Sequence, residues 1–160
     1  MTTSLLTRPS SGADDGLAYL ARKARNRRES ADDQHNYGFA LLQTGRAAEA
    51  IEWLERTVDL APYDHAAHTN YAAALHQVGR WNEGLYHARR AYELDPTKVM
   101  AIVNVAGFYY WFGETQEAAD WYAKAIRLDP THWQSWWMRL FMLDFLPISA
   151  EEALAERKRF

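Results

Sequence analysis

Cysteine is absent from the 160-residue chain. The absence excludes disulfide bonds, thiolate metal ligands and thiol catalysis, and it is compatible with a reducing compartment. Long apolar runs are missing as well, since no stretch approaches the roughly 18 consecutive apolar residues that a membrane span needs. The first residues, MTTSLLTRPSSGADD, have neither the basic region nor the apolar region of a secretory signal. We therefore expect a soluble, cytoplasmic protein without a membrane span.

Sequence motifs of catalysis are missing too. The chain contains no Gly-rich phosphate loop, no HExxH and no GxSxG. Its histidines have no carboxylate partner at ligand spacing, and His65 and His68, which could share one helix face, fit packing and capping roles better. The acidic pair Asp32 and Asp33 falls at an expected helix start, where the helix dipole accounts for it. The sequence therefore predicts no enzyme, no metal site and no cofactor.

The net charge of −3 is unevenly distributed. Residues 1–30 carry six Lys/Arg against three acidic residues, a balance of +3, so residues 31–160 carry −6. Nucleic-acid affinity comes mainly from lysine and arginine that displace counterions, so the acidic body argues against nucleic acid as a partner. The basic cluster from Arg22 to Arg28 lies in the later turns of an expected helix, where the dipole favours cations; a docking patch for an acidic partner or lipid is the alternative.

Glycine and proline are scarce, with eight and five residues, but three of each are regularly spaced. The same step of 34 residues separates Gly45, Gly79 and Gly113 and also Pro62, Pro96 and Pro130. Glycine permits a positive φ after a helix and proline cannot continue one, so each period predicts helix, turn, helix and stop. A period of this length indicates a solenoid whose units bury their apolar faces only by stacking.

Within the period, three positions carry small side chains in every unit. Counted from Ala31, His65 and Val99, they are position 8 (Gly38, Ala72, Ala106), position 20 (Ala50, Gly84, Ala118) and position 27 (Thr57, Ala91, Ala125). Small side chains let the two helices of a unit approach closely. Larger apolar residues at positions 7, 11 and 30, such as Tyr71, Leu75 and Leu94, are expected to fill the core.

This combination of period, small positions and terminal proline resembles the tetratricopeptide repeat family. The resemblance implies an all-α fold: a right-handed α-solenoid of helix-turn-helix repeats with an extra N-terminal helix and a C-terminal capping helix. It divides the chain into an expected disordered tail (1–13), a basic N-terminal helix (14–30), repeats one (31–64), two (65–98) and three (99–132), and a degenerate fourth repeat with the cap (133–160).

The fourth unit departs from the pattern. Trp136 stands at position 4, where the family often has Trp, but Leu140 replaces the small residue of position 8 and Pro147 replaces the turn glycine. Ser149 and Glu152 have the spacing of a capping box. They predict the start of a last charged helix over 150–160 that would shield the end of the stack.

The resemblance also implies that the first helix of each repeat lines a concave face. Position 6 of these helices is Asn36, Asn70 and Asn104. A side-chain amide offers one acceptor and two donors, so this asparagine ladder could hold a peptide backbone; capping or simple solvent exposure is the alternative. The expected peptide-binding groove further contains Phe39, Gln43, Gln77, Tyr110 and Trp111. It lacks the Lys and Arg with which some family members hold the C-terminal carboxylate of chaperones.

The run from Trp133 to Leu146 is too apolar on all sides for a helix with one buried face. Large exposed apolar patches are unusual on monomers, so we expect a cover: the last helix, a second copy of the chain or a downstream domain. The candidate oligomer surface consists of Trp133, Trp137, Phe141 and Phe145, with a homodimer as one option.

These expectations favour a non-catalytic protein-protein interaction scaffold that binds an extended or helical segment of another protein or peptide in the concave groove. Two alternatives stay open. Residues 143–160 resemble the segment that joins repeats to the catalytic region in bacterial relatives of O-GlcNAc transferase, which would make the chain a substrate-recognition fragment. Small chaperones of type III secretion translocators also have a similar length, three repeats and an N-terminal helix.

Overall fold

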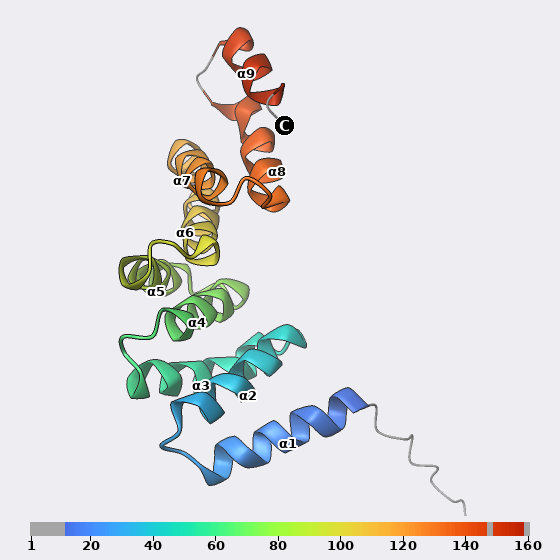
Figure 1. Cartoon of the computed structure of the whole chain (residues 1–160), viewed down its shortest axis with the longest axis vertical. Helices are drawn as coiled ribbons and strands as arrows, with labels where there is room; N and C mark the ends of the chain where they lie inside the picture. Colours follow the sequence, from blue (N-terminus) through green and yellow to red (C-terminus); the bar gives the residue numbers. More distant parts are fainter. Residues whose placement is uncertain (1–11, 147–148, 159–160) are drawn as a thin grey trace, which may run out of the picture.

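The computed structural model describes residues 12–146 and 149–158, and every regular element in these ranges is a helix. The predicted all-α class is therefore confirmed. In chain order (Figure 1) the elements are α1 (Gly12–Asn26), α2 (Ala31–Gln43), α3 (Ala47–Leu60), α4 (His65–Gln77), α5 (Trp81–Leu94), α6 (Val99–Trp111), α7 (Thr115–Leu128), α8 (Trp133–Met142), the 3-10 helix η1 (Leu143–Phe145) and α9 (Ala150–Arg157). Residues 1–11 of the expected tail and Pro147 lie outside the described residues.

The helices pack in successive pairs, α2 with α3, α4 with α5 and α6 with α7. Each pair contacts the next through α3 and α4, α5 and α6, and α7 and α8, so the pairs form one continuous stack (Figure 1). The predicted α-solenoid is confirmed by this arrangement. Helix α1 packs against α2 at one end of the stack, and α8, η1 and α9 follow one another at the other end.

Local signals in the sequence place the turns. The first helices of the three pairs are followed by Gly45, Gly79 and Gly113, whose φ angles are +75°, +79° and +80°. This left-handed conformation is one that side-chain-bearing residues rarely adopt, which explains the glycine at each turn. The second helices end at Leu60, Leu94 and Leu128, just before the three periodic prolines. The predicted helix, turn, helix and stop is confirmed in each period.

Capping side chains fix the ends of other helices. The Oγ of Ser30 accepts a hydrogen bond from the backbone N–H of Asp33 at 3.4 Å and begins α2. Because Ser30 is this N-cap, the helix expected over 14–30 ends at Asn26, and residues 27–30 form the connection. The predicted capping box of α9 is confirmed: Ser149 Oγ accepts from the N–H of Glu152 at 3.1 Å, and the Glu152 carboxylate accepts from the N–H of Ser149 at 2.8 Å.

The core lies between the helices at the small positions. All nine residues at positions 8, 20 and 27 are buried. A Cβ on Gly38 would lie 2.8 Å from Cγ of Leu54, and a Cβ on Gly84 would collide with the ring of Phe108. The close approach expected from the sequence is therefore present, and at these two positions it excludes even a methyl group.

Among the described residues, no helix combines the length and the apolar character that crossing a membrane requires.

Two helical glycines provide a stability test of this packing. Gly84→Ala should lower the free energy of unfolding by about 1–3 kcal/mol, because the new methyl group overpacks the contact with Phe108. Gly107→Ala, in α6, should raise it by about 0.5–1 kcal/mol, because no atom lies within 4 Å of the new Cβ and alanine favours the helix. Urea unfolding measured by circular dichroism checks both signs. Shifts in the same direction for the two variants would contradict the packing described here.

Candidate functional site

The first helices of the repeats line the inner face of the stack. Helix α4 contacts both α2 and α6, whereas in the described part of the chain α3, α5 and α7 have no contacts of that extent with one another. The stack therefore curves toward α2, α4 and α6. All eight residues of the predicted groove lie on these three helices, and none of them is buried.

Two members of the asparagine ladder bind the preceding first helix. Asn70 Nδ2 lies 2.7 Å from Nε2 of His35, and Asn104 Nδ2 donates to the carbonyl oxygen of Thr69 at 3.0 Å. Burial lowers the pKa of His35, which favours the neutral ring whose Nε2 can accept from the amide. Asn36 is exposed. The ladder therefore has a structural role between repeats that the sequence did not reveal, and its contact with a peptide stays a prediction.

The Asn70 side chain also borders open space on this face. It lines a cavity of about 290 Å³ together with residues from α4, from the turn between α5 and α6 and from the start of α6, namely His65, Ala66, Thr69, Thr97, Lys98, Val99 and Met100. The Nδ1 atom of His65 is buried and has no hydrogen-bond partner among the described residues. An amide carries two donor hydrogens and an acceptor oxygen, so the bond to His35 leaves Asn70 with capacity for a ligand.

Aromatic rings gather at the α6 end of the groove. Trp111, half exposed, stacks on Trp81 with ring centroids 5.6 Å apart and meets His76 edge-on at 5.7 Å. His76 lies on α4, one of the three helices expected to line the groove. Trp81 was not among the predicted site residues, because it begins α5, which is the second helix of its repeat. Phe39, Gln43 and Gln77 are exposed on α2 and α4.

Gly107 lies in the interior of α6 between the ladder and the aromatic rings. Spacings of three and four residues put it on the same helix face as Asn104 and Trp111. Apart from its chain neighbours and the backbone of α6 itself, no atom of the described residues lies within 4 Å of the position that its Cβ would occupy. The backbone of α6 is therefore open at this point of the inner face.

A pair of histidines joins α4 and α5. Nδ1 of His68 lies 2.9 Å from Nδ1 of His87, and Nε2 of His68 lies 3.1 Å from the carbonyl oxygen of Pro62. The carbonyl can only accept, so His68 carries its proton on Nε2 and its Nδ1 accepts from His87. His68 is buried, and both histidines line a cavity of about 660 Å³ together with residues that include Tyr63 and Tyr86.

The sequence spacing allowed His65 and His68 to share one helix face, but the ring that contacts His68 is that of His87. Burial lowers the pKa of both paired rings. The pKa of His87 falls to about 4, mainly through burial and to a smaller extent through its neighbour His68. Within the described residues, no group of three or more potential ligands is placed to hold a metal ion. The signal that could have found the pair is weak, because the two residues are separated by a turn and lie on different helices.

The histidine pair predicts a loss of stability as the pH falls below about 6.5. A folded-state pKa below the ordinary 6.5 means that the unfolded chain binds protons first, so stability is full above about pH 6.5 and falls as the pH drops toward 4. Because the His87 ring is only half-buried and solvent screens it, its depressed pKa corresponds to about 1–2 kcal/mol of unfolding free energy across that window. His87→Gln, which keeps a donor but does not titrate, should flatten this part of the profile in urea unfolding. An unchanged slope would show that the pair does not control it.

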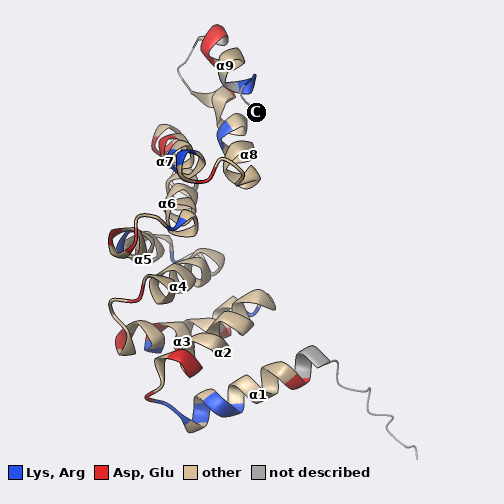
Figure 2. Cartoon of the chain, viewed as in Figure 1, with Lys and Arg blue, Asp and Glu red and all other residues tan. Residues whose placement is uncertain are grey.

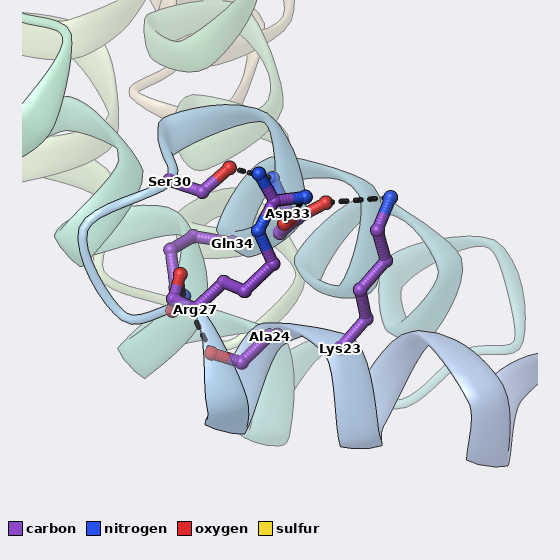
Figure 3. A network of polar contacts seen from close by, with 6 residues as sticks. All are labelled: Lys23, Ala24, Arg27, Ser30, Asp33 and Gln34. Atoms are coloured by element: carbon purple, nitrogen blue, oxygen red, sulfur yellow. Dashed lines mark hydrogen bonds and ion pairs between the residues drawn. The ribbon is translucent and has the colours of Figure 1, made fainter.

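The basic N-terminal helix is tied to the first repeat through a buried polar network (Figure 3). The Asp33 carboxylate, 3% exposed, lies 2.9 Å from Lys23 Nζ and 3.0 Å from Arg27 Nη1. The hydrogen bond from Lys23 is the main cause of its lowered pKa. Buried Gln34 donates to the carbonyl oxygens of Ala24 at 2.8 Å and Arg27 at 3.2 Å.

The network changes the roles expected for Asp33 and for the basic cluster from Arg22 to Arg28. Asp33 was attributed to the helix dipole alone, but it is a buried ion-pair partner. Lys23 and Arg27 belong to the basic cluster at the end of α1, which is visible beside the acidic start of α2 (Figure 2). Part of that cluster therefore serves internal docking, while Arg22, Arg25 and Arg28 remain exposed.

The four residues of the predicted oligomer surface are all exposed. Trp133, Trp137, Phe141 and Phe145 have exposed fractions of 63%, 63%, 46% and 66%. Helix α9, which is joined to η1 by an ion pair between Arg157 and Asp144, does not cover them. Phe141 and Phe145 also line a cavity of about 350 Å³ with Tyr110, Trp111, Gly113, Thr115 and Met142, so the structure brings residues from both predicted sites together.

Comparison with known proteins matches the chain to repeat proteins. The family model of subunit 3 of the anaphase-promoting complex (cyclosome) matches residues 13–91. No curated protein matches the sequence. The resemblance of residues 143–160 to glycosyltransferase linkers is not addressed by these matches and stays a hypothesis.

Several solved structures share the architecture. A MamA crystal structure superposes with a TM-score of 0.81 at 18% identity, over 92% of this chain and 80% of that chain. MamA from Desulfovibrio magneticus RS-1 gives 0.78 at 18% identity, over 92% and 81% of the two chains. YrrB, a TPR protein with an unusual peptide-binding site, gives 0.71 at 22% identity, over 78% and 64%. At these identities the likeness concerns the fold.

Proposed function

The chain folds as a tetratricopeptide repeat solenoid, and from this fold we propose that it is a non-catalytic interaction scaffold that binds an extended or helical segment of another protein. The segment lies along the inner face formed by α2, α4 and α6. The asparagine ladder contacts its backbone, and the exposed rings of Phe39, Tyr110 and Trp111 contact its side chains. YrrB, whose fold is similar, has a peptide-binding site, which supports this reading of the fold.

The observation that carries the proposal is the open backbone at Gly107. Glycine inside a helix costs about 1 kcal/mol relative to alanine. At Gly38 and Gly84 the tight helix packing explains the glycine, but at Gly107 no side chain in the described part of the chain packs near the missing Cβ. A ligand backbone that approaches α6 closely between Asn104 and Trp111 would need the space that a side chain at position 107 would fill, which explains the glycine. Neighbouring Met100, which is 54% exposed, extends the same contact surface toward the start of α6.

To test the groove, peptides that bind the whole chain are first selected from a random displayed peptide library. Gly107→Leu should raise the Kd of the selected peptides at least tenfold, because the new side chain occupies the space that the ligand backbone needs. Gly16→Leu is the matched control, since Gly16 is also helical with nothing within 4 Å of its Cβ position but lies on α1. Fluorescence anisotropy measures binding, and circular dichroism verifies the fold.

The comparison of wild type with Gly107→Leu distinguishes peptides bound in the groove from peptides bound elsewhere. Peptides that bind wild type and Gly107→Leu equally occupy another surface, and the groove proposal is then wrong. Asn36→Ala is the cleaner probe of the ladder, because Asn70→Ala and Asn104→Ala would also remove bonds between repeats.

A second proposal concerns the partner class. The exposed aromatic face of α8 and η1 supports self-association into a homodimer, since apolar patches beyond a few hundred Å² are rarely left uncovered on a monomer. Sedimentation that shows only monomer at high concentration would rule it out.

A further inference from the structure

The exposed aromatic face has a regular geometry. Trp133, Trp137, Phe141 and Phe145 are spaced four residues apart, so their side chains follow one side of α8 and continue onto η1. Among them only Phe141 and Phe145 are close partners, with ring centroids 5.5 Å apart. The four rings form a strip, called here the α8 strip.

The α8 strip carries no charge of its own. Helix α8 has a single charged residue, Arg139, whose guanidinium donates to the carbonyl oxygen of Ala119 in α7 at 2.9 Å. Asp144 in η1 is paired with Arg157. Two copies of such a strip can approach without like-charge repulsion, whereas a charged partner would find no complement among these residues.

The cavity of about 350 Å³ lies at one end of the strip. Phe141 and Phe145 form one wall, and Tyr110 and Trp111 of α6 form the other. Its lining residues are uncharged and mostly apolar. A volume of this size is at the lower end of those that hold small ligands, so it can accept one large aromatic side chain.

At the opposite end of the strip stands Trp133, 63% exposed. A two-fold axis makes residue i of one copy contact residue j of the other and the reverse. With α8 antiparallel across such an axis at the middle of the strip, Trp137 faces Phe141 of the second copy. The same operation brings Trp133 of the second copy to Phe145, at the mouth of the cavity.

We propose that the cavity between α6 and η1 receives Trp133 of a second copy, which makes the α8 strip an antiparallel, two-fold homodimer interface with two identical tryptophan insertions. This inference rests on the self-association proposed above and adds its geometry. A buried tryptophan in a fitted pocket is the kind of residue that dominates interface energy.

The area is sufficient for such an interface. Aromatic side chains bury roughly 150–250 Å² each, so the exposed parts of the strip and of Tyr110 and Trp111 offer about 600 Å² per copy. A pair of copies would bury about 1,200 Å², which is at the lower limit of specific protein interfaces. We therefore expect dimerisation at micromolar concentrations.

The absence of cysteine from the chain permits a direct test by crosslinking. Trp137→Cys and Phe141→Cys proteins are prepared separately, mixed and oxidised, and the mixture should give a disulfide-linked dimer. Trp133→Cys alone should not link to itself, because the antiparallel arrangement puts the two copies of position 133 at opposite ends of the interface.

Sedimentation velocity of the whole chain tests the cavity. Trp133→Ala should weaken the dimer at least tenfold, while Tyr86→Ala, which removes an equally exposed ring from α5, should leave it unchanged. Circular dichroism checks that both variants are folded.

Each failure has its own meaning. Monomer at all concentrations overturns both self-association and this geometry. A wild-type dimer without the mixed crosslink overturns only the antiparallel geometry, as does efficient self-linking of Trp133→Cys. A dimer that is insensitive to Trp133→Ala overturns the assignment of the cavity.

Discussion

The separation between helix axes controls the rest of this structure. No single helix pair can bury its apolar face, so each must press against the next, and the small residues at three positions of the repeat decide how closely it can do so. Where Phe108 rests over Gly84, even one methyl group is excluded. The turns, the proline stops and the caps then serve this contact, because they set the length and angle of every helix that takes part.

A stack of repeats has two ends where the terminal helices lack a neighbouring repeat, and the two ends of this chain differ in how these helices are covered. At the N-terminal end, α1 supplies polar partners: the buried Asp33 receives two cations, and the buried Gln34 bonds the carbonyls at the end of α1. A buried carboxylate is tolerated only with such partners, which fixes the register of α1. At the C-terminal end, within residues 133–146 and 149–158, no equivalent network covers the rings of α8. The first end is closed within the chain, and the second is available to a partner.

The sequence was most informative where the controlling interaction is local. The turn glycines, the Ser149 capping box and the small positions were predicted because each depends on residues within one turn or one period. Contacts between helices were missed for the opposite reason. His68 and His87, Asn104 and Thr69, and Trp81 and Trp111 become neighbours only when α4, α5 and α6 take their places, and no spacing rule encodes that. The groove helices could thus be predicted from sequence, while the partners of their side chains could not.

The helical glycines of the chain fall into two groups, according to whether helix packing requires the missing side chain. At Gly84, stacking requires the missing side chain, so replacement acts on the whole fold. At Gly107 the helix gives up stability with no compensating contact from the described residues, an arrangement that selection for folding alone would tend to remove. The positions that specify stacking are also distinct from those that face the inner surface. A repeat built in this way can change its groove residues without repacking its core, so the specificity of the scaffold can vary while its architecture stays constant.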